Sequence, residues 1–229
     1  MRTLPEPFAG WFAARGWTPR PHQMALLEAA EAGRSALLIA PTGGGKTLAG
    51  FLPSLTDLAQ GRPDQGATRG LHTLYISPLK ALAVDIARNL TTPIEEMGLP
   101  IRVETRTGDT PANRRQRQRE NPPEILLSTP ESLVLLLSLP DAAEIFGRLR
   151  AVVVDEVHAL AGTKRGDQLA LCLSRLQRLS PGLRRIGLSA TVAQPEALRA
   201  WIAPDARPEG AALITGQGGA DPSLEIVLP

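Results

Sequence analysis

The 229-residue sequence contains a single cysteine and no long hydrophobic run. Cys172 lies in an apolar stretch, so we expect a buried, unreactive thiol, and no disulfide can form within the chain. No apolar run approaches the roughly 18 residues that a membrane span needs. The first residues, with Pro5, Glu6 and Pro7, lack the basic and then apolar form of a signal peptide. These absences predict a cytoplasmic protein without a membrane partner.

Lysine is scarce, because arginine supplies every one of the 25 basic side chains except Lys46, Lys80 and Lys164. An ammonium is compact and a guanidinium is a planar fork, so an arginine-rich chain can keep lysine where the smaller cation is needed. The alternative is that the bias reflects a GC-rich genome, and for Lys164 neither explanation is favoured. The net charge of +2 does not by itself demand nucleic acid, although the pI near 9.1 permits it.

Short runs rich in Val, Ile and Leu alternate with longer stretches of helical period along the chain. The length and the 43% hydrophobic content fit one large α/β domain. The pattern predicts a mostly parallel sheet with helices on both faces. The predicted strands are residues 35–40, 71–77, 101–105, 125–128, 151–155 and 185–189. Five prolines stand where helical patterns begin, at positions where a missing N–H is harmless: Pro21, Pro78, Pro111, Pro130 and Pro195.

A phosphate-binding loop follows the first predicted strand and reads Ala40-Pro41-Thr42-Gly43-Gly44-Gly45-Lys46-Thr47. Its glycines let the backbone curl so that N–H groups point at phosphate oxygens at a helix N-terminus. Lys46 would contact the β- and γ-phosphates, and the Thr47 hydroxyl would bind Mg²⁺. The loop therefore predicts ATP and Mg²⁺ as cofactors. The predicted ATP-binding residues within it are Thr42, Gly43, Gly44, Gly45, Lys46 and Thr47.

Two carboxylates, Asp155 and Glu156, end a later apolar strand. A magnesium-dependent hydrolase needs such a pair beside the phosphates. Asp155 would hold Mg²⁺ through water, and Glu156 would orient and deprotonate the attacking water. Alone, the pair would be better explained as an ordinary helix N-terminus, where acidic residues suit the dipole. Together with the phosphate loop, it predicts Lys46, Asp155 and Glu156 as catalytic residues and Thr47 and Asp155 as metal ligands.

Several motifs in order then resemble a known family. Asp155-Glu156-Val157-His158 resembles the DExH signature of superfamily 2 helicases, and Ser189-Ala190-Thr191 resembles their Ser-Ala-Thr motif. Segments 77–82, 106–110, 128–132 and 162–166 resemble the Lhr group, most nearly its ligase-associated DNA DExH helicases. The resemblance runs from about Gly16 to Trp201. It implies a three-layer, RecA-like P-loop NTPase domain that is the first of two motor lobes.

The same resemblance implies further residues of the nucleotide site. Segment 16–23 is similar to a Q-motif, in which Gln23 would read the adenine edge with a carboxamide that both donates and accepts. His158 would couple the nucleotide site to Ser189 and Thr191. Trp17 would pack near the base. The favoured alternative for Trp17 is hydrophobic packing within the N-terminal segment, which also contains Trp11 and Phe12.

Three predicted loops, 78–80, 107–110 and 129–132, each follow a strand and open a helix. Small hydroxyls, backbone N–H groups and a lysine suit phosphates and carry no base code, so we expect sequence-independent strand binding. The alternative for each loop is a helix cap, which can coexist with phosphate contact. We expect the arginines of 114–119 to belong to a solvated polar helix. The predicted nucleic-acid-binding residues are Pro78, Lys80, Thr107, Gly108, Asp109, Thr129, Glu131, Ser132 and Lys164.

The chain is expected to divide into an N-terminal segment (1–19), the ATP-binding lobe (20–203) and a Pro/Gly/Ala-rich segment (204–229) leading toward a second RecA-like lobe. The resemblance implies an ATP-dependent DNA helicase or translocase in DNA repair, whose arginine finger lies on that second lobe. This chain alone should then have weak ATPase or none. The implied partners are single-stranded or partly duplex DNA, a DNA ligase and a nuclease. The alternatives are a non-catalytic nucleotide- and strand-binding fragment and the lobe of an RNA helicase.

Overall fold

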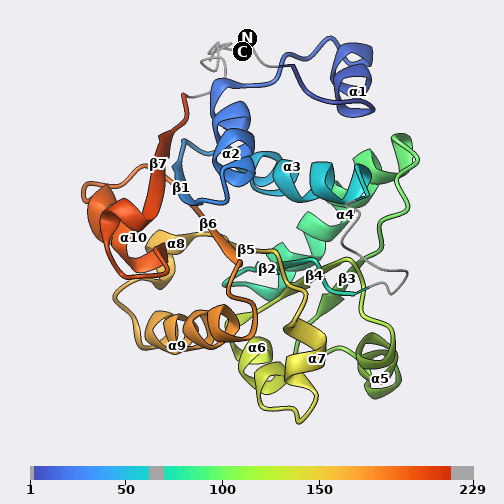
Figure 1. The fold of residues 1–229 in the computed structure, drawn as a ribbon, viewed down its shortest axis with the longest axis vertical. Helices are drawn as coiled ribbons and strands as arrows, with labels where there is room; N and C mark the ends of the chain where they lie inside the picture. The colour runs from blue at the N-terminus through green and yellow to red at the C-terminus, as the bar shows by residue number, and fades with distance from the viewer. Residues whose placement is uncertain (1–2, 62–69, 218–229) are drawn as a thin grey trace, which may run out of the picture.

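The computed structural model describes residues 3–61 and 70–217. Within them a parallel sheet of seven strands runs in the order β3-β4-β2-β5-β6-β1-β7 (Figure 1). None of the described helices is long and apolar enough to span a membrane. The strands are β1 (Ser35–Ile39), β2 (Thr73–Ile76), β3 (Val103–Arg106), β4 (Ile125–Ser128), β5 (Ala151–Val154), β6 (Arg184–Ser189) and β7 (Ala211–Thr215).

Helices cover both faces of the sheet, so the fold has three layers (Figure 1). On one face lie α1 (Phe8–Ala14), α2 (Pro21–Glu31), α3 (Lys46–Ala59) and α4 (Lys80–Glu96). On the other lie α6 (Pro130–Leu137), α7 (Ala142–Phe146), α8 (Val157–Leu160), α9 (Lys164–Leu179) and α10 (Pro195–Ile202). The polar helix α5 (Ala112–Glu120) follows the edge strand β3, and a short 3₁₀ turn, η1 (Pro208–Gly210), precedes β7.

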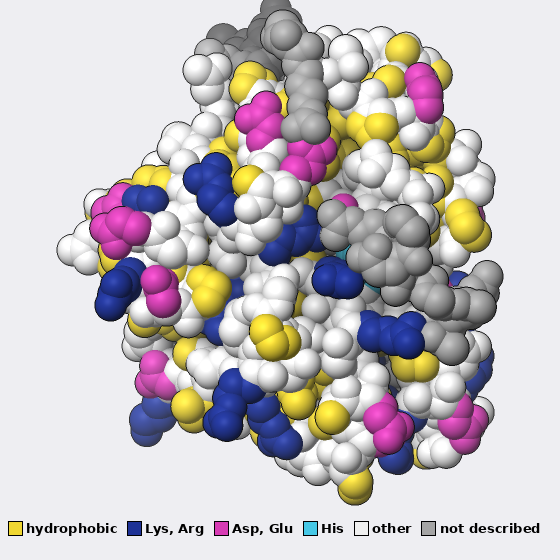
Figure 2. All heavy atoms as spheres, in the orientation of Figure 1, with side chains coloured by type: hydrophobic (Ala, Val, Ile, Leu, Met, Phe, Trp, Pro, Cys, Tyr) yellow, Lys and Arg dark blue, Asp and Glu magenta, His cyan; other side chains and the backbone are white. Residues whose placement is uncertain are grey.

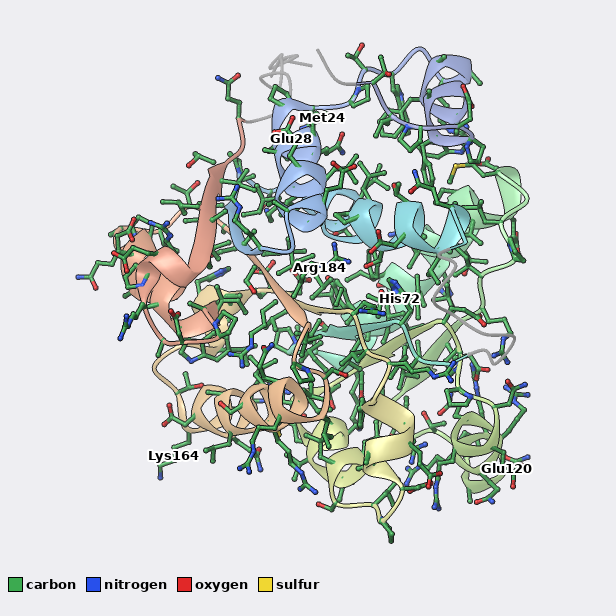
Figure 3. All side chains as sticks on the ribbon, viewed as in Figure 1. Met24, Glu28, His72, Glu120, Lys164 and Arg184 are labelled. Carbon is green, nitrogen blue, oxygen red and sulfur yellow. The ribbon has the colours of Figure 1, made fainter. Side chains whose placement is uncertain are left out.

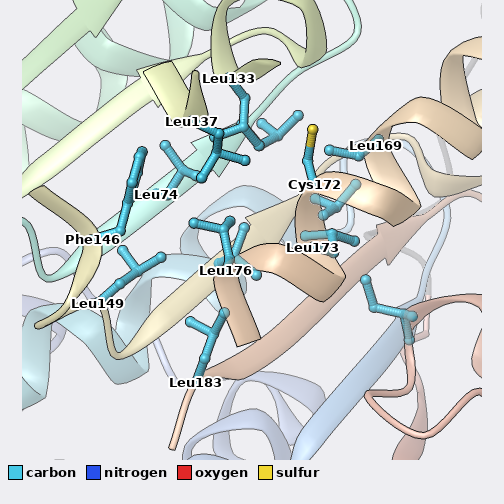
Figure 4. Close-up of a cluster of buried hydrophobic side chains, with 14 of the residues drawn as sticks. Leu74, Leu133, Leu137, Phe146, Leu149, Leu169, Cys172, Leu173, Leu176 and Leu183 are labelled. Carbon is cyan, nitrogen blue, oxygen red and sulfur yellow. The ribbon is translucent and has the colours of Figure 1, made fainter. Parts of the chain in front are cut away.

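The central strands read as continuous apolar runs because both of their faces are buried. Successive side chains of a strand point to opposite faces, so Leu37 enters one core and Leu38 the other. Val152 and Val153 divide between the two cores in the same way. Figure 4 shows the core under α6 and α9, in which Cys172 lies among leucines. Cys172 is buried, as expected, and burial raises the pKa of its thiol.

All six predicted strands are present; β4 has the expected boundaries, and those of the other five differ by one or two residues at an end. The structure adds a seventh strand, β7, which was not among the six predicted and which pairs in parallel with β1 over its whole length. Its Ala-rich sequence and the prolines before it hid a strand that tertiary pairing stabilises. The sheet thus continues past residue 203. The sequence also has an apolar run at 224–228, which lies outside the described residues.

Candidate nucleotide site and nucleic-acid interface

The predicted motifs meet at one edge of the sheet. The phosphate loop follows β1, the acidic pair follows β5, and Ser189-Ala190-Thr191 begins at the end of β6. The three predicted strand-binding loops follow β2, β3 and β4. Because all of these strands run parallel, their carboxyl ends line up, and this edge is where ligands bind in open α/β sheets.

The phosphate loop has the tight backbone that its glycines predict. Gly43 and Gly45 adopt left-handed conformations with φ of 76° and 73°. A Cβ on Gly44 would lie 2.8 Å from the Pro41 carbonyl oxygen, so only glycine fits there. Lys46 begins α3, and its Nζ donates to the carbonyl oxygens of Ala40 (2.8 Å) and Pro41 (3.0 Å). The ammonium therefore lies across the mouth of the loop, while Thr42 and Gly43 are exposed at its tip.

Two residues of α2 support this loop from below. His22 is buried, and its Nε2–H donates to the Gly44 carbonyl oxygen at 2.9 Å. Burial lowers the pKa of His22, so the ring is held neutral. Gln23 is also buried; its Oε1 accepts from the Arg20 N–H at 2.8 Å, and a Cβ on Gly45 would lie 3.4 Å from its Nε2. Sequence reasoning missed His22, although it directly precedes Gln23 in the same segment. The adenine contact of Gln23 stays a prediction.

The acidic pair lies in two different environments. Asp155 is 6% exposed, and burial raises the pKa of its carboxyl group. The buried Tyr75 hydroxyl lies beside it, and burial together with the Asp155 charge raises the pKa of Tyr75. Glu156 is half-buried and holds a left-handed φ of 49°, an uncommon conformation for a residue with a side chain. A buried carboxylate short of positive charge suits a divalent cation, so Asp155 fits the Mg²⁺ site predicted for it.

Glu156 does not cap a helix with its side chain; it instead lies 3.1 Å from Nε2 of His158. The other ring nitrogen of His158, Nδ1, accepts from the Ala190 N–H at 3.4 Å and lies 3.1 Å from the Ser189 hydroxyl. The proton of a neutral ring must therefore be on Nε2, facing Glu156. The structure brings the DExH and Ser-Ala-Thr segments into contact. Thr191 is exposed and makes no hydrogen bond to this group within the described residues.

A cavity of about 450 Å³ opens beside the phosphate loop, between α1, α3 and α4. Trp11 and Phe12 pack edge to face at 5.3 Å, as the hydrophobic-packing alternative predicts. Trp11 also meets Trp17 at 5.6 Å, but Trp17 is 55% exposed and lines the cavity. The Arg15 guanidinium lies 4.2 Å from the Trp11 ring centre, and Glu96 accepts the Trp11 indole N–H at 2.9 Å. The lining also includes Gly45 and Thr47 of the phosphate loop.

Among the three loops predicted to bind a nucleic-acid strand, one ion pair connects the first two with each other and another connects the third with α9. Lys80 Nζ lies 3.0 Å from Asp109 Oδ2, which connects the loops after β2 and β3. Glu131 pairs with Arg165, whose Nη2 is 3.1 Å from Oε2, and hydrogen bonds from Arg165 lower the pKa of Glu131. Lys164 is exposed at the start of α9, where Figure 3 shows it pointing away from the domain.

The hydroxyl groups of these loops are mostly turned inward. Thr129 caps α6, because its Oγ1 accepts a hydrogen bond from the Ser132 N–H at 3.4 Å. The helix-cap alternative therefore holds for this loop. Thr107 is buried, whereas Gly108 and Asp109 are exposed. Pro78 is partly buried beside the exposed Lys80. The exposed groups that could meet a phosphate are therefore Lys80, Lys164 and the backbone near Gly108.

The arginines of α5 belong to a polar helix, as expected, but most of them are engaged. Arg114 and Arg117 both reach Glu104, at 3.2 and 3.0 Å. Arg119 pairs with Asp141 at 2.9 Å. Acidic and basic side chains are interspersed on the face seen in Figure 2, which agrees with the small net charge. Any affinity for a nucleic-acid strand must then come from the local placement of individual cations and not from a surface of uniformly positive charge.

Comparison with known proteins places these features in a family. The model of the DEAD/DEAH box helicase family matches residues 20–199. The Lhr helicase of Mycolicibacterium smegmatis is 48% identical over 84% of this chain, and the Lhr helicase/uracil glycosylase of Escherichia coli is 41% identical over 99%. This chain spans 13% and 16% of those proteins. The resemblance to the Lhr group is confirmed, while the narrower one to ligase-associated helicases stays a prediction.

Solved structures agree. The structure of helicase Lhr from Mycobacterium smegmatis, bound to single-stranded DNA and AMP-PNP, has a TM-score of 0.81 and 43% identity over 93% of this chain. This chain covers 28% of that one. Helicase MrfA bound to DNA gives a TM-score of 0.80 at 29% identity over 95% of this chain, of which this chain covers 31%. These matches confirm the RecA-like helicase fold.

Proposed function

Because this chain belongs to the DEAD/DEAH box helicase family, we propose that it is the ATP-binding motor lobe of an ATP-dependent DNA helicase or translocase acting in DNA repair. The observation that supports this most directly is the contact of His158 with both Glu156 and Ser189, at the same sheet edge as the phosphate loop. That contact joins a candidate general base to a segment beyond the nucleotide site. It is an arrangement suited to coupling hydrolysis to strand binding.

In this proposal the chain binds and orients ATP for attack by water in line with the γ-phosphate. Lys46 leaves the carbonyl oxygens of its own loop and contacts the β- and γ-phosphates. Thr47 and Asp155 would hold Mg²⁺, which would supply positive charge to neutralise the phosphates. Glu156 positions the water and takes its proton, and its contact with His158 holds the carboxylate in place.

The base of the nucleotide is proposed to enter the cavity beside the loop. Trp17 lines that cavity with an exposed ring face, and Thr47 lines it from the phosphate side. Gln23 lies next to Gly45 at the rim. We expect Trp17→Ala to weaken ATP binding by about threefold to tenfold through loss of stacking. An unchanged ATP affinity in Trp17→Ala would show that Trp17 only packs within the N-terminal segment.

The test is to measure ATPase of this chain with and without single-stranded DNA, beside Lys46→Ala and Glu156→Gln. Strand-stimulated turnover that both substitutions abolish supports an autonomous motor. No turnover, with nucleotide binding lost only in Lys46→Ala, supports the rival reading of a non-catalytic binding fragment. Arg178→Ala, an exposed cation on α9, is the control and should behave as wild type.

The choice of DNA over RNA is tested by repeating the titration with an RNA of the same sequence. Discrimination between the two must come from contacts to the 2′-hydroxyl. Equal or tighter binding of RNA would favour an RNA helicase lobe. The cytoplasmic location and the association with a ligase and a nuclease stay predictions that rest on the sequence.

A further inference from the structure

The loop between β3 and α5 is a tight turn closed by its own hydrogen bonds. The Thr107 N–H donates to Thr110 Oγ1 at 2.9 Å, and the Thr110 N–H donates to the Thr107 carbonyl oxygen at 3.2 Å. Both threonines are buried by this arrangement. The turn therefore exposes only its tip, Gly108 and Asp109.

A single arginine of the following helix holds this turn from inside. Arg115 is partly buried, and its Nε donates to the Thr110 carbonyl oxygen at 2.7 Å. Its Nη2 donates to the Gly108 carbonyl oxygen at 2.6 Å. Two N–H groups of one planar cation thus bind two carbonyl oxygens of one turn, and hydrogen bonds from a charged donor are the stronger kind. In return, Arg106 Nη1 donates to the Arg115 carbonyl oxygen at 3.1 Å and ties α5 to β3.

The two hydrogen bonds from Arg115 determine which backbone groups of the turn face solvent. In a trans peptide the C=O and the following N–H point in opposite directions. With the Gly108 carbonyl directed at Arg115, the N–H of Asp109 points away from Arg115. It has only a long contact, 3.4 Å, with Thr107 Oγ1. The Asp109 carboxylate lies 3.0 Å from Nζ of Lys80, the first residue of α4.

We propose that Arg115 is a positioning residue of the nucleic-acid interface, which holds the turn 107–110 so that the N–H of Asp109, at its exposed tip, faces a phosphate path beside Lys80. Arg115 does not contact the strand in this assignment; it acts through the two carbonyl oxygens. The inference rests on the proposed function, because it assumes that this edge binds a strand. It separates Arg115 from its neighbours Arg114 and Arg117, whose guanidinium groups bind Glu104 and donate no hydrogen bond to the turn among the described residues.

The experiment compares Arg115→Ala, Arg115→Lys and the matched control Arg117→Ala. Binding of a fluorescent single-stranded oligonucleotide is followed by anisotropy over a range of salt concentrations. ATP binding and thermal unfolding are measured on the same samples. Since the turn offers a neutral N–H group, losing its orientation should weaken binding without changing the number of counterions released.

We expect Arg115→Ala to weaken strand binding about threefold to tenfold with an unchanged salt slope, unchanged ATP binding and an unchanged unfolding midpoint. Arg115→Lys should recover part of the affinity, because an ammonium can reach one carbonyl oxygen but cannot bridge both. Arg117→Ala should bind as wild type.

Three results would overturn the assignment. A salt slope reduced by about 0.7 would make Arg115 a direct phosphate ligand. Equal affinity of Arg115→Ala and wild type would remove the turn from the interface. Parallel loss of ATP binding or of thermal stability would give Arg115 a general structural role. If wild type itself binds no strand, the proposed function fails instead, and the two failures are thereby distinguished.

Discussion

Lys80 and Asp109 form an ion pair at the edge of the sheet that is proposed to bind nucleic acid, with Nζ 3.1 Å from Oδ1 and 3.0 Å from Oδ2. The two residues follow β2 and β3, which are not neighbours, because β4 lies between them. Both side chains are more than half exposed. A phosphate that approaches Lys80 must compete with a carboxylate already in place.

Removing that carboxylate should strengthen strand binding. We expect Asp109→Asn to raise single-strand affinity about twofold to fivefold at low salt, because an exposed ion pair contributes little stability while its anion repels phosphate. The gain should shrink as salt is added. Asp85→Asn, which removes an exposed carboxylate 4.0 Å from Arg88, is the control. Equal or weaker binding by Asp109→Asn would show that Asp109 assists the strand.

The contact between His158 and Ser189 predicts a loss of coupling. We expect His158→Ala to keep its ATP affinity, because the ring makes no contact with the phosphate loop within the described residues. The change in strand affinity that an ATP analogue produces should fall to within about twofold of none. Strand titrations with and without the analogue measure this. Coupling that survives in His158→Ala would contradict the role assigned to the ring.

His22 predicts an acid-sensitive phosphate loop. Burial, with Arg20 and Lys46 nearby, lowers the pKa of His22 below its ordinary 6.5. Below pH 6.5 the histidine is therefore protonated in the unfolded chain before it is protonated in the folded protein. The stability contribution is complete above pH 6.5 and is lost as the pH falls below that value. The unfolding midpoint should drop between about pH 7 and pH 5, and less steeply in His22→Gln. Parallel pH profiles of the two proteins would contradict this account.

Gly166 is required where α9 begins. A Cβ there would lie 2.0 Å from the Leu160 carbonyl oxygen, so α8 and α9 must separate to admit it. We expect Gly166→Ala to destabilise the fold by about 2–3 kcal/mol, measured by denaturant unfolding. Gly182→Ala is the matched control, since nothing lies within 4 Å of its added Cβ. A difference below about 0.5 kcal/mol between the two variants would show that the helix start is more pliable than the structure indicates.

A buried ion pair lies at the amino ends of the strands, on the side of the sheet away from the phosphate loop. Arg184 Nη2 contacts Asp57 Oδ2 there, and its Nη1 donates to the Ala30 carbonyl oxygen at 2.9 Å. His72 Nε2 lies 3.9 Å from the same carboxylate, and Figure 3 shows His72 and Arg184 in this region. Asp57→Asn leaves the arginine charge buried without its partner, so we expect a loss of about 3 kcal/mol. ATP binding should persist at saturating nucleotide. A loss no larger than that of the exposed Asp85→Asn would show that water reaches the pair.

The elements of the candidate nucleotide site were predictable from local pattern. The glycines of 43–45, the run into Asp155 and Glu156 and the prolines at helix starts each act through their own backbone or their place after a strand. Strand boundaries were less exact at β2 and β3 because neighbouring apolar residues continue the pattern beyond the paired segment. Strand β7 was not predictable, since its pairing with β1 outweighs a composition typical of a loop.

The sequence by itself determined which chemical groups stand at the ends of which strands, because parallel pairing and strand polarity follow from the alternation of apolar runs and helices. Only the tertiary structure decided which of those groups meet. The bonds of His22 to Gly44, of Lys80 to Asp109 and of Arg115 to Gly108 depend on side-chain direction and on distances of about 3 Å between separate elements. No local pattern encodes such distances. The sequence therefore identifies the residues of the candidate site, and the packing of separate elements determines which of them bond to one another.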